Sequence, residues 1–234
     1  MSTVTLASVN TQSPGRSLGA KLLDIFVSPG EVFDEVVASK RNLANWRVPT
    51  LLACLTGVVL LQAASPAAQT VAAIEELIQG KIVSVAQGQK MLGGWQVLSI
   101  LTTCFGTFVG TIWSAFVIWF IGRVFLKSRF PFLKALEVVG LTGLILVLGS
   151  VVTQLLIVLS GDPATRPSLG LFAGKMASST ALRELLNLMN VFHLWSAAVL
   201  AVGLSKLSGA GFKESAFWVF GYWIALRVAL IILG

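Results

Sequence analysis

The stretch "ALEVVGLTGLILVLGSVVTQLLIVL", residues 135–159, decides the fold class of this chain. At 1.5 Å per residue, an apolar helix of this length crosses the roughly 30 Å hydrocarbon core of a bilayer. The whole chain of 234 residues has the same character, because it is 56% hydrophobic, only 12% charged and has a mean hydropathy of +0.86. These values predict an integral membrane protein.

Four further apolar runs are bounded by charged residues or by Pro and Gly, as is typical of membrane-spanning helices. We therefore expect an all-α integral membrane protein with five transmembrane helices, at about 47–64, 95–122, 135–159, 186–206 and 215–233. The chain divides into a disordered N-terminal tail at 1–17, cytoplasmic interfacial helices at 18–45 and a five-helix transmembrane domain at 46–234. The tail lacks the apolar segment of a signal peptide, so the first span is expected to direct insertion.

Lys and Arg are distributed unevenly between the two sides that these spans define. The N-terminal side carries eleven of them: Arg16, Lys21, Lys40, Arg41, Arg47, Arg123, Lys127, Arg129, Lys134, Lys206 and Lys213. The other side carries five: Lys81, Lys90, Arg166, Lys175 and Arg183. The positive-inside rule then predicts a cytoplasmic N-terminus and an external C-terminus. The net charge of +7 is explained by this topology and by anionic lipid headgroups, so the lipid bilayer is the expected partner and nucleic acid is not.

The segment "FVSPGEVFDEV", residues 26–36, has the pattern of a helix start. Ser28 is expected to cap the helix, Pro29 to occupy its first position, and Glu31 to complete a capping box. Phe33 then lies on an apolar face opposite acidic residues. A helix this short cannot span a bilayer, so we expect it to lie on the cytoplasmic membrane surface, preceded by a second amphipathic stripe at Leu18, Leu22, Ile25 and Phe26.

The outer loop at 65–94 contains apolar residues at helical spacing, after a start signal at Ser65 and Pro66. The pattern predicts one amphipathic helix that continues to about Val85 and lies on the membrane or caps the bundle.

Four polar side chains fall within the predicted spans, in the outer half of the bilayer: Gln154, Asn190, His193 and Arg227. Such residues are costly in lipid unless they are paired or hydrated. One interpretation is a polar pocket or relay in which His193 titrates near neutral pH. The other is hydrogen bonding between helices, with Arg227 reaching the outer surface.

Gly106 and Gly110 form a GxxxG motif in the second predicted span. This motif permits close approach of two helices, either between two copies of the chain or within one copy. A homodimer is therefore one expected partnership, beside other membrane proteins.

Catalytic chemistry finds little support in the residues. Cys54 and Cys104 lie within spans, without the His or carboxylate cluster that a metal site needs, and are expected to pack. Ser150 and His193 fall at similar depth, but a serine in a span usually bonds the preceding helical turn. No catalytic residue, metal or cofactor is predicted, and the protein is not expected to be an enzyme.

Two regions of the chain resemble the Yip (Ypt-interacting protein) domain family. The N-terminal resemblance rests on Pro29, Glu31, Phe33, Trp46 and Pro49, and the C-terminal one on "NVFHLWSAAVLAVGLSKLSG", with Asn190, Phe192, Leu194, Trp195, Leu200 and Gly203 in matching positions. The resemblance is to the bacterial branch and implies five spans with the N-terminus inside, in the inner membrane.

The resemblance also implies a membrane-organising protein, or one that interacts with proteins or lipids, rather than an enzyme. Eukaryotic members associate with small GTPases, but this chain lacks their extended aromatic and Pro-rich cytosolic region. The alternative is a small transporter or channel that uses the four intramembrane polar residues.

Overall fold

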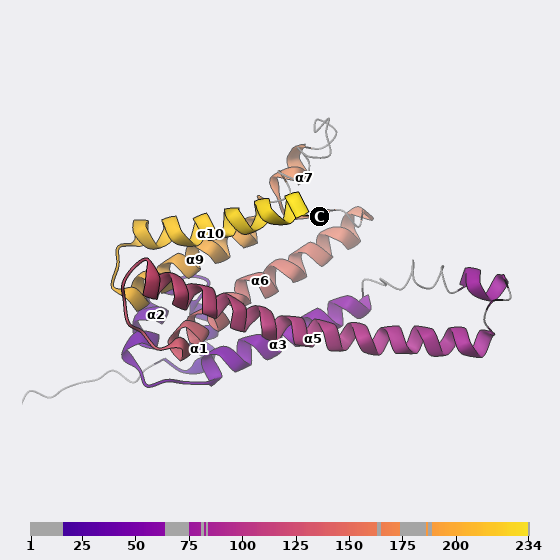
Figure 1. Ribbon diagram of the computed structural model, residues 1–234, viewed down its shortest axis with the longest axis horizontal. Helices are drawn as coiled ribbons and strands as arrows, with labels where there is room; N and C mark the ends of the chain where they lie inside the picture. Colours follow the sequence, from indigo (N-terminus) through magenta and orange to yellow (C-terminus); the bar gives the residue numbers. More distant parts are fainter. Residues whose placement is uncertain are drawn as a thin grey trace, which may run out of the picture.

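The computed structural model describes residues 16–63, 75–80, 82, 84–162, 165–173, 186 and 189–233. Within these ranges the regular structure is helical and no strand forms. The helices are α1 (Leu18–Asp24), α2 (Pro29–Ala38), α3 (Ala44–Ala63), α5 (Val85–Val124), α6 (Phe132–Ser160), α7 (Leu169–Ala173), α9 (Val191–Ser208) and α10 (Phe212–Leu233) (Figure 1). The prediction of an all-helical protein is confirmed.

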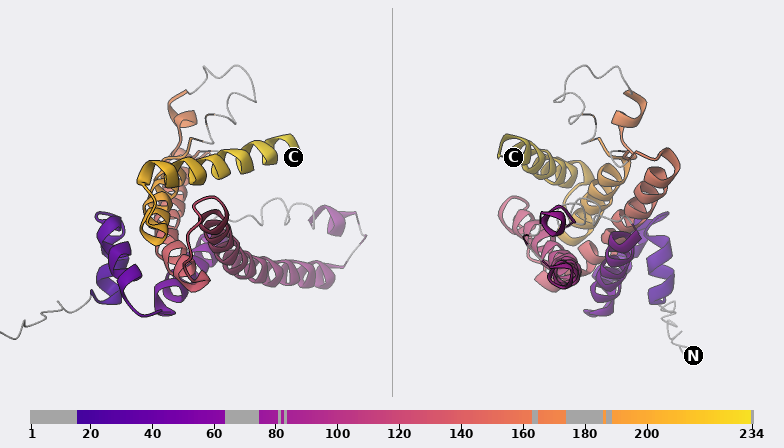
Figure 2. Two further views of the ribbon diagram at one scale, coloured as in Figure 1. Left: turned by 60° about the vertical axis from the view of Figure 1, so that its left-hand side comes forward. Right: turned by 90° about the vertical axis from the view of Figure 1, so that its right-hand side faces the viewer.

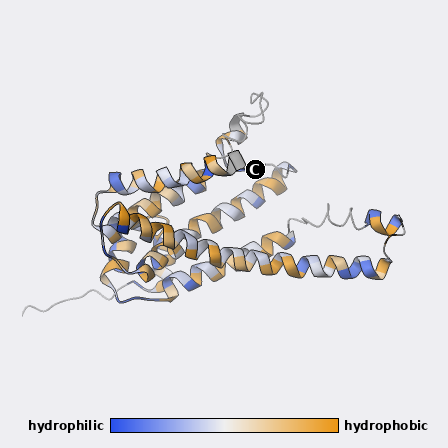
Figure 3. Ribbon diagram, viewed as in Figure 1, coloured by the Kyte–Doolittle hydropathy of each residue, from blue (hydrophilic) through white to orange (hydrophobic). Residues whose placement is uncertain are grey.

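Among the described helices, four, α3, α5, α6 and α9, are long and apolar enough to cross a membrane. α10 has 22 residues but includes three charged side chains, those of Lys213, Glu214 and Arg227. A fifth span therefore stays a prediction. Hydrophobic residues dominate the middle of the long helices, and hydrophilic residues gather at the first turns of α5 and in the connections at the opposite end (Figure 3).

α5 differs most from its predicted bounds, because it has 40 residues and begins at Val85, not near Trp95. Ser84 starts it with a capping box, in which its hydroxyl accepts from Gln87 N (3.3 Å) and its own N–H donates to Gln87 Oε1 (2.8 Å). The prediction of one amphipathic helix that continues to about Val85 is thus wrong. Residues 75–79 are helical, a turn follows at Gly80, and a new helix begins at Val85. The first part of that prediction, 64–74, lies outside the described residues.

α6 lies at the centre of the bundle and packs against α3, α5 and α9. Glycines allow two of these contacts. A Cβ at Gly140 would stand 2.4 Å from Trp46 Cα of α3, and one at Gly203 of α9 would stand 2.3 Å from Val138 Cγ1 of α6. The connection from α5 to α6, the connection from α9 to α10 and the α1–α2 hairpin lie at one end of the bundle, while the start of α5 extends beyond the other (Figures 1 and 2).

The sequence suggested that α2 rests its apolar face on the membrane surface, and the structure differs. Val32, Phe33 and Val36 are fully buried against residues of α6 and α9, in a cluster that includes Val138, Leu141, Ile145 and Val199. Protein, not the membrane surface, covers this face. Whether the hairpin also lies at the membrane interface stays a prediction.

The predicted capping box at Ser28 is wrong, because the Ser28 side chain makes no capping hydrogen bond. Glu31 instead pairs with Arg16, whose guanidinium also binds Asp24 (Nε to Oδ2, 3.0 Å) and Glu35 (Nη1 to Oε1, 3.2 Å). The hydrogen bond to Glu31, together with these neighbouring charges, raises the pKa of Arg16 above its ordinary value. One side chain thereby joins α1 to α2, a long-range pairing that a local capping pattern cannot predict.

Candidate functional site: a polar cavity between α6 and α9

The start of α9 sets one wall of the candidate site. Asn190 caps the helix, since its Oδ1 accepts a hydrogen bond from Phe192 N at 2.9 Å. The cap places the start of α9 at Val191, five residues after the predicted start of this span. Ser168 and Pro167 of the preceding loop contact this start, through a backbone bridge to Asn190 and a bond from Val191 N to Pro167 O (3.1 Å).

Close approach of α6 and α9 brings polar residues of both helices around one cavity. A Cβ at Gly149 of α6 would stand 2.7 Å from Phe192 Cβ, so only glycine fits this crossing point. Around it lies a cavity of about 330 Å³, lined by Ser150, Thr153, Gln154, Arg166, Asn190 and His193, among others. The structure therefore brings together three of the four polar residues singled out in the sequence.

The fourth, Arg227 of α10, does not line this cavity but contacts His193. Its Nη2 lies 3.4 Å from His193 Nδ1, and its guanidinium lies over the Trp223 ring at 5.7 Å from the centroid. Nδ1 can accept this hydrogen bond when the imidazole is neutral and Nε2 holds the proton. Arg227 and His193 also line a second cavity of about 390 Å³, so His193 borders both cavities.

These side chains offer hydrogen-bond donors and acceptors around a space large enough for water or a small polar solute. The structure also supports part of the packing interpretation, because His193 and Arg227 contact each other across two helices. Asn190, in contrast, uses its side-chain oxygen to cap its own helix. Ser150 donates to Leu146 O at 2.9 Å, as expected for a serine that bonds the preceding turn. Across the described part of the chain, no group of His, Cys, Asp or Glu is arranged to hold a metal ion.

The GxxxG glycines do not mediate close packing within one copy of the chain. Among the described residues, nothing lies within 4 Å of a Cβ built at Gly106 or Gly110. The close contact between α3 and α5 is instead at Gly57, where a Cβ would stand 3.0 Å from Thr103 Cγ2. A homodimer through Gly106 and Gly110 stays a prediction.

A second polar cluster was missed in the sequence. Glu137 and Lys134 of α6 are 1% and 7% exposed and form an ion pair at 3.2 Å. The Glu137 carboxylate also accepts from Asn45 Nδ2 (2.6 Å) and Asn42 N (3.2 Å), while Lys134 Nζ donates to the backbone oxygens of Val36 and Lys40. The i,i+3 spacing of Lys134 and Glu137 is the only local signal of this cluster, since its other members come from another part of the chain.

The family-motif residues of the two ends of the chain meet in the structure. Phe33 of α2 packs on Gly203 of α9, where a Cβ would lie 3.2 Å from its Cε2. Trp195 of α9 makes an edge contact with Phe26, the residue that precedes α2 by a short turn, with ring centroids 5.9 Å apart. These positions join the hairpin to the bundle.

Apolar helices of spanning length, packed around α6, define an integral, multi-pass α-helical membrane protein. More specifically, residues 23–234 match the family model of the Yip1 domain, and the chain belongs to this family. The resemblance seen in the sequence is thereby confirmed. A search of curated proteins and a search of solved structures return no match.

Proposed function

We propose that the protein is a non-enzymatic component that organises the membrane by binding proteins or lipids through its N-terminal hairpin. The observation that supports this role is the attachment of the hairpin. Its inner face is buried on α6 and α9, while Leu23, Val27 and Val37 on the outside are 72%, 87% and 43% exposed. Exposed apolar side chains on the outer face of the hairpin are suited to contact with a partner protein or a lipid surface.

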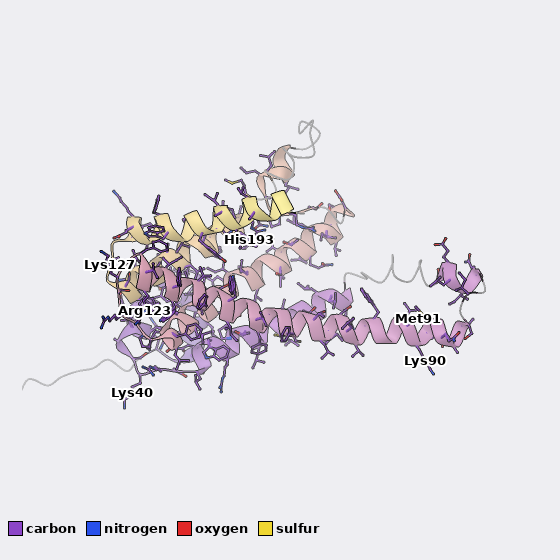
Figure 4. All side chains as sticks on the ribbon, in the orientation of Figure 1. Lys40, Lys90, Met91, Arg123, Lys127 and His193 are labelled. Atoms are coloured by element: carbon purple, nitrogen blue, oxygen red, sulfur yellow. The ribbon has the colours of Figure 1, made fainter. Side chains whose placement is uncertain are left out.

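The proposed orientation has five spans in the bacterial inner membrane, a cytoplasmic N-terminus and an external C-terminus. The distribution of exposed cations supports this orientation. Lys40, Arg123 and Lys127 lie at the end of the bundle that holds the hairpin (Figure 4), and the same segments and the first turn of α10 carry four more: Arg41, Arg47, Arg129 and Lys213. Such an excess is typical of cytoplasmic loops. Reporter fusions after α10 test this orientation, and a cytoplasmic C-terminus would contradict it.

Photo-crosslinking in the native membrane tests the role of the hairpin. A photoreactive residue at Leu23 or Val27 is expected to form discrete adducts with a protein or a lipid headgroup. A matched probe at Phe105, which is 71% exposed on α5, samples the surface of a span instead. The proposal fails if the hairpin positions give no adducts, or give the same adducts as Phe105.

A second candidate function is a small transporter or channel. The observation that favours it is the polar cavity between α6 and α9, with the His193 and Arg227 contact beside it. Solute flux into reconstituted vesicles is the appropriate measurement. A transporter is expected to lose most of its flux in His193→Ala and Arg227→Ala, and the absence of any solute-dependent flux in the parent protein would exclude this function.

A further inference from the structure

We propose that the groove between α5 and α10 binds one acyl chain of an anionic phospholipid, whose headgroup is held by Arg123 and Lys127. This inference goes beyond the role proposed for the hairpin, because it places a lipid partner at a separate surface of the bundle. It is carried by three features of the structure: an aromatic groove of one leaflet's depth, a cationic mouth, and an unusual backbone conformation at that mouth.

The groove is a cavity of about 510 Å³ whose walls are almost wholly apolar. Phe116 and Phe120 of α5, and Phe125 just after it, line one side, and Phe217 and Trp218 of α10 line the other. Two contacts bridge the helices: Phe125 stacks on Trp218 with ring centroids 3.9 Å apart, and Trp113 Nε1 donates to Tyr222 Oη at 3.1 Å. Phe217 is 69% exposed, so the rim is open sideways to the membrane.

The depth of the groove suits one leaflet. Its lining runs from Trp113 to Phe125 along α5 and from Phe217 to Ala225 along α10, which is about 18 Å and about 12 Å at 1.5 Å per residue. The hydrocarbon of one leaflet is about 15 Å thick, half of the roughly 30 Å core. A chain that enters at the end of α5 would therefore be covered over most of its length.

The mouth of the groove is cationic. Arg123 lies in the last turn of α5, with its guanidinium over the Trp119 ring at 5.5 Å from the centroid, and Lys127 follows the end of that helix. Both lie at the end of the bundle where α10 begins (Figure 4), and Lys213 lies in the first turn of α10. All three are exposed, and none pairs with a carboxylate in the described part of the chain. One exposed acid, Glu214, stands beside Lys213. The remaining excess of positive charge is complementary to a phosphate headgroup.

Lys127 has a backbone conformation that favours glycine. Its φ of 50° lies in the left-handed region, where the chain turns away from α5 and Ser128 N donates to Gly122 O at 2.9 Å. Glycine is the usual residue at such a helix end, because a side chain there costs free energy. A lysine at this position, instead of glycine, holds an exposed positive charge at the end of α5.

Trp218 serves as a reporter of the acyl chain. The protein is reconstituted in phosphatidylcholine vesicles that contain phosphatidylglycerol, with bromine on the acyl chains of one lipid or the other. The difference in quenching between the parent protein and Trp218→Phe gives the signal of Trp218 alone, separate from that of the other six tryptophans. Brominated phosphatidylglycerol is expected to quench Trp218 more than brominated phosphatidylcholine does, and the preference should weaken at high salt.

Lys127→Gly removes the charge and keeps the backbone conformation, and Arg123→Gln removes the second charge. Each is expected to reduce the preference for phosphatidylglycerol about fivefold, and the double variant to abolish it. Lys90→Gln is the matched control, because it removes one exposed charge at the opposite end of α5 (Figure 4). An unchanged preference in the double variant, or an equal loss in Lys90→Gln, would overturn the proposal.

Gly221→Leu tests occupancy of the groove. Gly221 lines the groove, and among the described residues nothing outside its own helical turns lies within 4 Å of a Cβ at this position, so a leucine side chain is expected to occupy part of the groove. Quenching of Trp218 by both brominated lipids is expected to fall while the melting temperature is maintained. If this variant instead separates two copies of the chain and leaves quenching unchanged, the groove binds a helix and the lipid proposal is wrong.

The two proposals can fail separately. Loss of the hairpin crosslinks with an intact phosphatidylglycerol preference would reject the role of the hairpin and keep the lipid site. The reverse result would reject only the lipid site.

Discussion

Asn45 Nδ2 of α3 donates a hydrogen bond of 2.6 Å to Glu137 Oε2 of α6, across 92 residues of chain, and both side chains are almost fully buried. Lys134 neutralises the same carboxylate and binds the last turn of α2 through Val36 O. Three helices thus share one buried charge pair. A buried pair is costly to break, because the remaining partner is left as an uncompensated charge.

Glu137→Ala is therefore expected to lower the free energy of unfolding by about 3–5 kcal/mol. The double variant Lys134→Met with Glu137→Leu removes both charges and should recover part of this loss, because Asn45 Nδ2 and Asn42 N still lack their acceptor. Denaturant titration of the purified protein in detergent measures both values. A loss below about 1 kcal/mol in Glu137→Ala would show that the pair does not hold the three helices together.

Gly203→Ala tests the contact between α9 and α6. The new methyl would stand 2.3 Å from Val138 Cγ1 and 3.2 Å from Phe33 Cε2, so the helices must separate, at a cost of about 1–3 kcal/mol. Gly143→Ala in α6 is the matched control, because no described atom lies within 4 Å of its Cβ position. It should be neutral or stabilising by up to about 1 kcal/mol. Equal melting temperatures for the two variants would contradict the packing described.

Phe33→Ala is expected to release the hairpin from the bundle. Phe33 is fully buried between α6 and α9, and loss of a buried aromatic ring costs about 3–5 kcal/mol. Val37→Ala, on the outer face of the same helix, should change the free energy by less than about 0.5 kcal/mol. Hydrogen exchange of the α2 amides reports the release directly. Unchanged protection in Phe33→Ala would mean that other contacts hold the hairpin.

Asn190→Ala and Ser28→Ala compare a helix cap that forms with one that does not. Asn190 accepts from Phe192 N, so its removal should cost about 1 kcal/mol. Ser28 makes no such bond through its side chain, so its replacement should cost only a few tenths. Thermal melts of the two variants give the difference. Equal costs would show that Ser28 caps α2 in solution.

Gly106→Leu with Gly110→Leu tests the GxxxG motif. Both glycines border a cavity of about 420 Å³ between α5, α3 and α6, and among the described residues nothing outside their own helical turns lies within 4 Å of a Cβ at either position. The stability of a single copy is therefore not expected to fall. If two copies associate through this face, the variant should also lose chemical crosslinks between them. Crosslinking that persists in the variant would exclude the motif as the dimer contact.

The class of the protein and its family could be predicted from the sequence, because both rest on local information. Hydropathy over about 20 residues defines a helix that can cross a bilayer, whatever it packs against. Short motifs such as Pro29, Glu31 and Phe33 pointed to the family that the match over residues 23–234 establishes. Residue counting along helices of known rise predicted a shared depth for Gln154, Asn190 and His193. The three residues line one cavity, although Asn190 caps α9 and does not lie inside it, and their depth in the bilayer stays a prediction.

Predictions failed where a side chain or a helix face could contact more than one partner and the local sequence did not show which. A local pattern placed a capping box at Ser28, but Glu31 binds Arg16 from outside the helix. The amphipathic pattern of α2 indicated a lipid-facing surface, yet an apolar face has the same pattern whether lipid or protein covers it. Glu137 was overlooked because its partner Asn45 is distant in sequence.

Helices of spanning length and their approximate positions are thus properties of the sequence, since each depends on the apolar character of one continuous segment. The pairing of those helices depends on tertiary structure alone. Gly203 packs against Val138 and Phe33, and Arg227 contacts His193. Each contact depends on the shapes of two helix surfaces together, and neither surface can be predicted to meet the other from its own segment of sequence.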